Sequence, residues 1–119
     1  MPADRHTTGR FLPLRPQWLH ILLSLAAGPR HGYAIMNEVD EWTEGRVRLW
    51  PATLYNTLRQ LLDERLIEEV DDPSEESGGP PRRPYALTPF GAEVLDAEAR
   101  RMQALVDAVR SARAAGGGR

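Results

Sequence analysis

The feature that most constrains the fold is the run of residues 51–70, where a helix pattern passes directly into a strand pattern. Leucines occur at the i, i+4, i+7 and i+8 spacing of one helical face: Leu54, Leu58, Leu61 and Leu62. Residues 66–70, Leu-Ile-Glu-Glu-Val, then have the composition of a short strand. The helix must bury its leucines against other elements, and the strand must pair with another strand. The run therefore predicts a small domain that combines helices with a little sheet.

The opposite face of this predicted central helix carries side chains that form hydrogen bonds. They are Thr53, Asn56, Arg59 and Gln60. Asn and Gln can bond bidentately to adenine and Arg can bond to guanine, so such a face suits a DNA major groove. An ordinary amphipathic surface helix shows the same pattern, and these residues alone favour that simpler interpretation.

A β-hairpin is predicted after the central helix. Residues 71–81 are mostly residues typical of turns and chain breaks, and residues 82–87 return as a second strand. Pro84 lacks an amide donor, which indicates an edge strand. Arg82 and Arg83 give this wing a basic shoulder of two adjacent positive charges. Its tip is acidic, so we expect the tip either to point away from nucleic acid or to be disordered.

Two helices are predicted before the central one, over residues 17–27 and 33–43. The first is apolar around most of its circumference, so it should be buried on more than one side. In so small a chain, one side is expected to pack on its own core and the other on a partner, with Leu19 and Leu22 at the partner contact. Two helices joined by a short link are a helix-turn-helix candidate.

A long helix is predicted at the end of the chain, from an N-cap at Thr88 and a first residue Pro89 to about residue 115. Such a helix has little monomer core to cover it, so a heptad pattern predicts dimerisation. The alternative is a helix folded back over its own domain. Residues 1–12 and 116–119 are expected to be a flexible arm and a tail. The heptad positions are Leu95, Met102, Leu105 and Val109.

Charge and composition limit the function classes. Fifteen basic and 17 acidic residues give a net charge of −2 and a pI of about 5.9, which counts against a strongly basic nucleic-acid binder. A protein that gathers its basic residues on one face is still allowed. The absence of cysteine excludes disulfides and thiolate zinc sites, and it favours a cytoplasmic location.

Neither catalysis nor membrane insertion is indicated. The three histidines are scattered, and no nucleophilic triad or metal-ligating cluster is present in the sequence. We therefore predict no enzyme, no cofactor and no metal site. The longest apolar run is too short to span a bilayer.

The sequence closely resembles the PadR family of transcriptional regulators. The resemblance is carried by runs at 22–39, 52–69 and 80–95, by the spacing between them, and by three motifs. These are His-Gly-Tyr at 31–33, Thr-Leu-Tyr at 53–55 and Arg-Arg-X-Tyr-X-Leu-Thr at 82–88.

The resemblance implies a mainly α fold with a small β-hairpin: a winged helix-turn-helix over 13–87 and a C-terminal dimerisation helix over 88–115. It implies a homodimer that binds an inverted-repeat operator in double-stranded DNA, usually as a repressor. By the same resemblance, four side chains lie near the DNA: Tyr33, Tyr55, Arg82 and Arg83.

An effector site is a further implication of the resemblance. Some PadR-like dimers bind flat aromatic compounds between their subunits, and Trp18 is the candidate to line such a site here. A plain core tryptophan is the alternative.

Two departures from the family pattern are expected to matter. Trp50 precedes the central helix and cannot cap it through its side chain, and Arg65 stands where glycine often ends that helix. The alternative function, from another class, is a winged-helix module that binds protein and does not read DNA. The low pI and the acidic wing favour that alternative.

Overall fold

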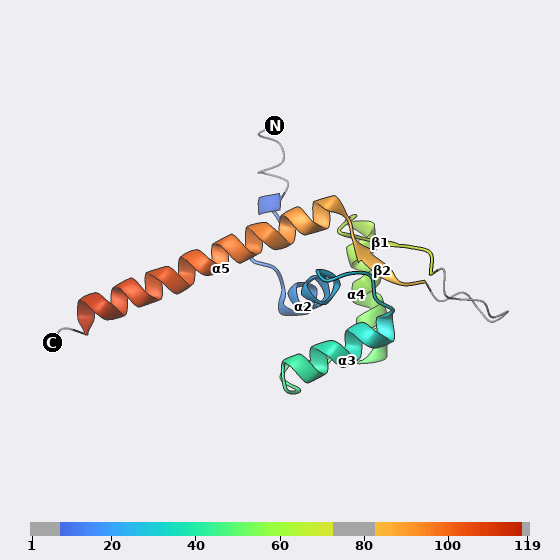
Figure 1. Cartoon of the computed structure of the whole chain (residues 1–119), viewed down its shortest axis with the longest axis horizontal. Helices are drawn as coiled ribbons and strands as arrows, with labels where there is room; N and C mark the ends of the chain where they lie inside the picture. The colour runs from blue at the N-terminus through green and yellow to red at the C-terminus, as the bar shows by residue number, and fades with distance from the viewer. Residues whose placement is uncertain (1–7, 73–82, 118–119) are drawn as a thin grey trace.

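The computed structural model describes residues 8–72 and 83–117 (Figure 1). Three helices, α2 (Pro16–Leu25), α3 (Gly32–Trp42) and α4 (Pro51–Asp63), form a bundle beside a two-stranded hairpin. The hairpin consists of β1 (Ile67–Glu69) and β2 (Tyr85–Leu87), and α5 (Pro89–Gly116) follows it. In Figure 1, α5 extends well beyond the domain, and α4 runs from α3 toward the start of α5. The predicted mainly α fold with a hairpin and a long last helix is confirmed.

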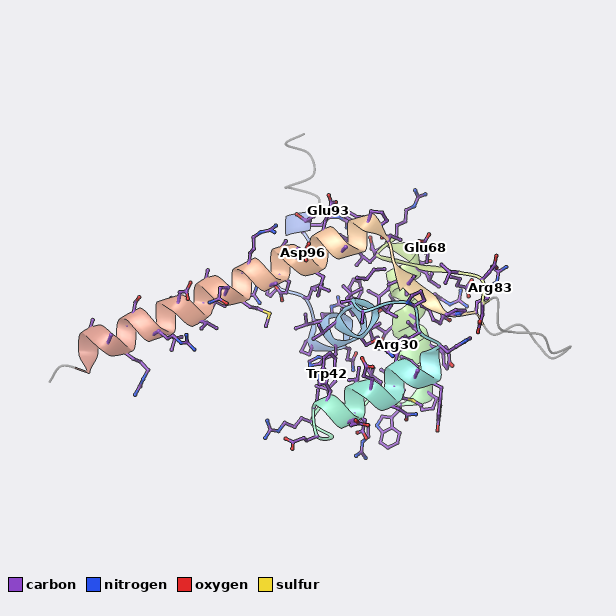
Figure 2. The ribbon with its side chains drawn as sticks, in the orientation of Figure 1. Arg30, Trp42, Glu68, Arg83, Glu93 and Asp96 are labelled. Carbon is purple, nitrogen blue, oxygen red and sulfur yellow. The ribbon has the colours of Figure 1, made fainter. Side chains whose placement is uncertain are left out.

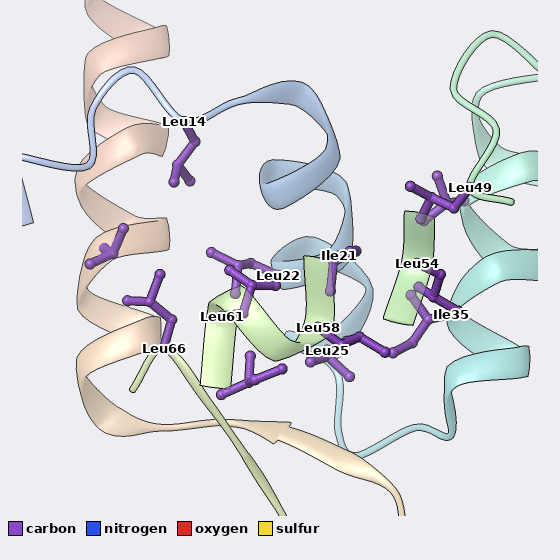
Figure 3. Packing of buried hydrophobic residues seen from close by; sticks show 13 residues of the cluster. Leu14, Ile21, Leu22, Leu25, Ile35, Leu49, Leu54, Leu58, Leu61 and Leu66 are labelled. Carbon is purple, nitrogen blue, oxygen red and sulfur yellow. The ribbon is translucent and has the colours of Figure 1, made fainter. Parts of the chain in front are cut away.

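The leucine face of α4 lies at the centre of the core (Figure 3). Leu54, Leu58 and Leu61 are at most 1% exposed, and they pack against buried side chains of α2 and α3. Burying one such side chain stabilises the fold by about 1.5–3 kcal/mol. Leu22 on α2 is completely buried in this same core. Its expected place at a dimer contact is therefore wrong, because it has no surface to offer a partner.

The hairpin is antiparallel, with Ile67 opposite Leu87 and Glu69 opposite Tyr85. Both strands are shorter than the predicted 66–70 and 82–87, although the Val70 amide still donates to the Pro84 carbonyl at 2.9 Å. On its other edge, β2 forms a pair of backbone hydrogen bonds between Tyr85 and Arg30, just before α3. The wing base is thus fixed to the helix-turn-helix by its backbone.

The joint between α4, β1 and α5 is unusually tight. Arg65, which stands where glycine often ends this helix, turns the chain with φ +62°, so a non-glycine residue adopts the left-handed conformation here. Thr88 caps α5 as predicted: its hydroxyl accepts from the Gly91 amide at 2.9 Å and donates to the Arg65 carbonyl at 2.6 Å. A Cβ on Gly91 would lie 1.9 Å from the Leu66 carbonyl oxygen, so only glycine fits.

The segment before α2 is packed rather than loose. The Arg10 guanidinium is 3.0 Å from the Glu64 carboxylate, and the Phe11 ring lies 5.9 Å from Phe90. The Leu14 amide donates to the buried Glu98 carboxylate at 3.0 Å. The expectation of a flexible arm over 1–12 is thus wrong for residues 8–12, because aromatic and ionic contacts hold them to α4 and α5. Residues 1–7 lie outside the described part.

Candidate nucleic-acid interface

The side chains predicted to read DNA lie on the solvent side of α4. Asn56, Arg59 and Gln60 are exposed, and Thr53 is half-buried beside them. The period of the helix explains this placement, since the leucines on the other side fill the core. No other described residue forms a hydrogen bond or an ion pair with the side chains of Asn56, Arg59 or Gln60. These three groups are therefore available to a ligand.

The His-Gly-Tyr and Thr-Leu-Tyr motifs meet in space. Tyr33 at the start of α3 is 67% exposed and Tyr55 on α4 is 52% exposed. Gly32 is buried beneath Tyr55, and a Cβ there would lie 2.9 Å from the Tyr55 hydroxyl oxygen. Gly32 thus makes room for the Tyr55 ring to cross from α4 to α3. Sequence reasoning named the two tyrosines but missed this reason for the glycine.

Arg83 lies just before β2, at the end of the described hairpin that is farther from α4 and α5 (Figure 2). Its Nη2 is 3.4 Å from the Asp71 carboxylate, and both side chains are more than half exposed. An exposed pair of this kind is weak and is screened by salt, so a phosphate could replace Asp71. Arg82 lies outside the described residues.

Two further contacts attach the wing to the helix-turn-helix. The His31 Nε2 is 2.9 Å from an Asp72 carboxylate oxygen, which links the residue before α3 to the chain that follows β1. Tyr85 lies beside both Glu69 and Tyr55; burial and the Glu69 carboxylate raise the pKa of its hydroxyl above the usual 10.0. That hydroxyl therefore stays protonated and remains a hydrogen-bond donor at neutral pH.

An exposed cation, Arg48, lies just before α4, and it was not among the residues predicted from the sequence to bind DNA. Arg48 is held between the Asp40 carboxylate, 3.2 Å from its Nε, and the Trp50 ring, whose centroid is 5.6 Å from its guanidinium carbon. Trp50 is 62% exposed at the N-cap of α4 and forms no side-chain cap, as expected. The sequence signal was the alternation of Arg48 and Trp50 around an apolar Leu49.

An apolar groove lies between α2 and α5, and several of the side chains that line it were expected at a dimer contact. Its volume is about 500 Å³. Two further apolar residues of the predicted pattern, Leu105 and Val109, are 53% and 58% exposed farther along α5. Leu23 on α2 takes the outward position that was assigned to Leu22. The groove is lined by Leu19, Leu23, Leu95, Asp96, Ala99, Met102, Gln103 and Val106.

Trp18 is half-buried and is not among the groove-lining residues. Its indole centroid lies 6.3 Å from the Phe11 ring, and the Arg15 guanidinium carbon lies 5.5 Å from the indole centroid. An aromatic ligand at Trp18 stays a prediction, and it would have to share or displace these contacts.

In the part of the chain that the structure describes, no group of three or more His, Asp or Glu side chains is placed to hold a metal ion. No helix in residues 8–72 or 83–117 is long and apolar enough to cross a membrane.

Comparison with known proteins gives a family and a fold. A model of the "Transcriptional regulator PadR-like family" matches residues 21–97. A Streptomyces fradiae protein described as an uncharacterized 37.1 kDa protein in transposon TN4556 is 44% identical over 85 residues. The match covers 71% of this chain and 22% of that protein, so the chain spans about a fifth of the relative's length.

Among solved structures, PadR of Bacillus subtilis in complex with operator DNA is 25% identical, with a TM-score of 0.61. That match covers 71% of this chain and 46% of the other. A PadR-like regulator of Bacillus cereus has a TM-score of 0.64 at 22% identity, covering 79% of this chain and 87% of the other, which shows the shared fold.

Proposed function

The chain belongs to the PadR-like family of transcriptional regulators, and from this premise we propose that it represses transcription as a homodimer on an inverted-repeat operator. In this proposal α4 enters the major groove, and the wing contacts the flanking backbone or the minor groove. A two-fold dimer places its two recognition helices one helical turn of DNA apart, or a multiple of that distance.

The observation that carries the proposal is the exposed polar face of α4. Asn56, Arg59 and Gln60 leave the helix on the solvent side with no partner among the described residues, and their groups match base edges in the major groove. In Figure 1 the first turns of α4 lie near α3, away from α5. The DNA surface and the groove on α2 and α5 are therefore on different parts of the molecule. The Bacillus subtilis structure, with its operator DNA, supports the same use of the fold.

The test is a titration of the purified protein against DNA from upstream of its own gene, with random duplex as the control, at several salt concentrations. We expect Asn56→Ala and Gln60→Ala each to cost about 1–3 kcal/mol on the cognate site and to relax its sequence preference. Gln17→Ala, an exposed glutamine on α2, is the matched control and should bind as wild type. Equal losses of Asn56→Ala on operator and random DNA would contradict base reading.

The dimer part of the proposal has its own test at Met102, which is 41% exposed and lines the groove. Met102→Asp should raise the dimer dissociation constant at least about tenfold, because a carboxylate would have to be buried without a partner. Ala104→Asp adds the same charge on the opposite face of α5 and should leave the dimer intact. Sedimentation equilibrium measures both. A Met102→Asp protein that stays dimeric would place the interface elsewhere.

One observation favours the second candidate, a winged helix that binds protein. Two described cations near α4 are paired with carboxylates: Arg83 with Asp71, and Arg48 with Asp40. The net charge of −2 points the same way. Binding without selectivity for the promoter at any salt concentration would favour this candidate over operator reading.

A further inference from the structure

The residues that lead into α4 alternate between the core and the surface. Leu49 is 1% exposed, whereas Arg48 and Trp50 on either side of it are exposed. The backbone is extended at Trp50, with φ −70° and ψ 152°, and the Arg48 guanidinium carbon lies 5.6 Å from the centroid of the Trp50 ring, so the two side chains are on the same side. The buried leucine therefore directs Arg48 and Trp50 outward together, immediately before the face of α4 that is proposed to read DNA.

The loop that carries this pair is held in place from within. The Thr43 hydroxyl accepts from the Val47 amide at 3.0 Å and donates to the Val39 carbonyl at 2.8 Å, closing the chain after α3. Gly45, at φ +78°, lets the loop pass close to Arg48, because a Cβ there would lie 3.3 Å from the Arg48 Nη2. Arg48 is therefore carried by a loop that is held in place by hydrogen bonds.

We propose that Arg48 binds a DNA phosphate next to the recognition helix, that Trp50 is its positioning residue, and that Asp40 competes with the phosphate. This inference rests on the proposed DNA-binding function. An indole face holds a guanidinium by cation–π attraction without neutralising its charge or using its N–H donors. Arg48 therefore keeps donors that a phosphate can accept in a bidentate, charge-assisted pair.

Asp40 does not prevent this contact. The Arg48 and Asp40 side chains are 54% and 46% exposed, so water and salt weaken their pairing. When Arg48 neutralises a DNA phosphate, a counterion condensed on the DNA is released, and this release favours the phosphate contact at low salt. Free protein would keep the Arg48 Nε on Asp40 and the guanidinium beside Trp50, and DNA would draw that guanidinium away from the carboxylate.

The experiment measures the slope of log K against log salt for operator and random duplex. One lost phosphate contact lowers the slope by about 0.9, which is about fivefold in affinity at 0.15 M salt. We expect this change for Arg48→Ala on both DNAs. Arg110→Ala, which removes an exposed arginine on α5, is the matched control and should keep the wild-type slope. Trp50→Ala should lose most of the same contact, and Trp50→Phe, which keeps an aromatic face, should restore it.

A double-mutant cycle tests the competition. Asp40→Asn should tighten binding to both DNAs, and most of that gain should vanish in the Arg48→Ala background. An unchanged slope for Arg48→Ala, in a wild-type protein that selects its operator, would overturn the inference and leave the proposed function standing. A loss on operator but not on random DNA would also overturn it, because Arg48 would then read bases. Wild-type protein without salt-dependent DNA binding would instead remove the proposed function itself.

Discussion

Gly91→Ala is expected to lower the free energy of unfolding by about 3 kcal/mol, the upper range for overpacking a well-filled site. An added Cβ would lie 1.9 Å from the Leu66 carbonyl oxygen and 2.8 Å from its carbonyl carbon. Both atoms belong to the backbone, so no side-chain rotation can relieve the clash. Relief requires that α5 move away from the chain between α4 and β1, which would also strain the Thr88 cap. Urea unfolding at one fixed protein concentration measures the change.

The same substitution at Gly116 is the matched control, because it lies in the same helix with no atom within 4 Å of the Cβ position. Gly116→Ala is expected to be neutral or stabilising by up to about 1 kcal/mol, since alanine is the better helix former. If both variants unfolded alike, the close approach of α5 to Leu66 would be absent in solution. A loss of stability in Gly91→Ala but not in Gly116→Ala would establish this close approach.

Much of the fold follows from periodicity in the sequence. The 3.6-residue spacing of leucines located α4 and its buried face, and the Thr-Pro pair located the start of α5. Contacts between distant segments were not predictable in the same way. Nothing in the pattern of α5 shows that Gly91 packs against Leu66, because a glycine in a helix usually indicates only a weaker helix. Leu22 was misplaced because a helix that is apolar all round does not reveal which side faces its own core.

The candidate site was predictable where it lies on a regular element. The helical period placed Asn56 and Gln60 on the outer face of α4, and the structure puts them there. Arg48 and Trp50 were missed as a pair because they lie in an irregular connection, where only the alternation around Leu49 carries a signal. Their meeting with Asp40 depends on how the loop folds back along α3, which no local pattern encodes.

Glu98→Ala is expected to cost about 3 kcal/mol of stability, because it breaks a buried network. Glu98 interrupts the apolar heptad pattern of α5, yet its side chain is 1% exposed and joins two segments. It accepts from the Leu14 amide at 3.0 Å and from the Arg101 Nε and Nη2 at 2.6 and 3.0 Å. Removing it leaves the Leu14 donor buried without a partner and releases the segment before α2. Glu93→Ala, an exposed glutamate on the same helix, should change stability by less than about 0.5 kcal/mol.

The contribution of Glu98 to stability should depend on pH, and the hydrogen bonds of its carboxylate determine the direction. The Arg101 hydrogen bonds and the Leu14 amide together lower the pKa of Glu98 below its usual 4.5, despite its burial. The folded state thus binds the proton less tightly than the unfolded state, so the ionised carboxylate stabilises the fold above pH 4.5. That contribution is lost as the pH falls from 4.5 through the lower folded-state pKa. The stability difference between wild type and Glu98→Ala should therefore be constant near pH 7 and shrink below pH 4.5. If the stability difference stayed constant down to pH 3, protonation of Glu98 would not weaken the fold. Glu98 would then act through packing alone.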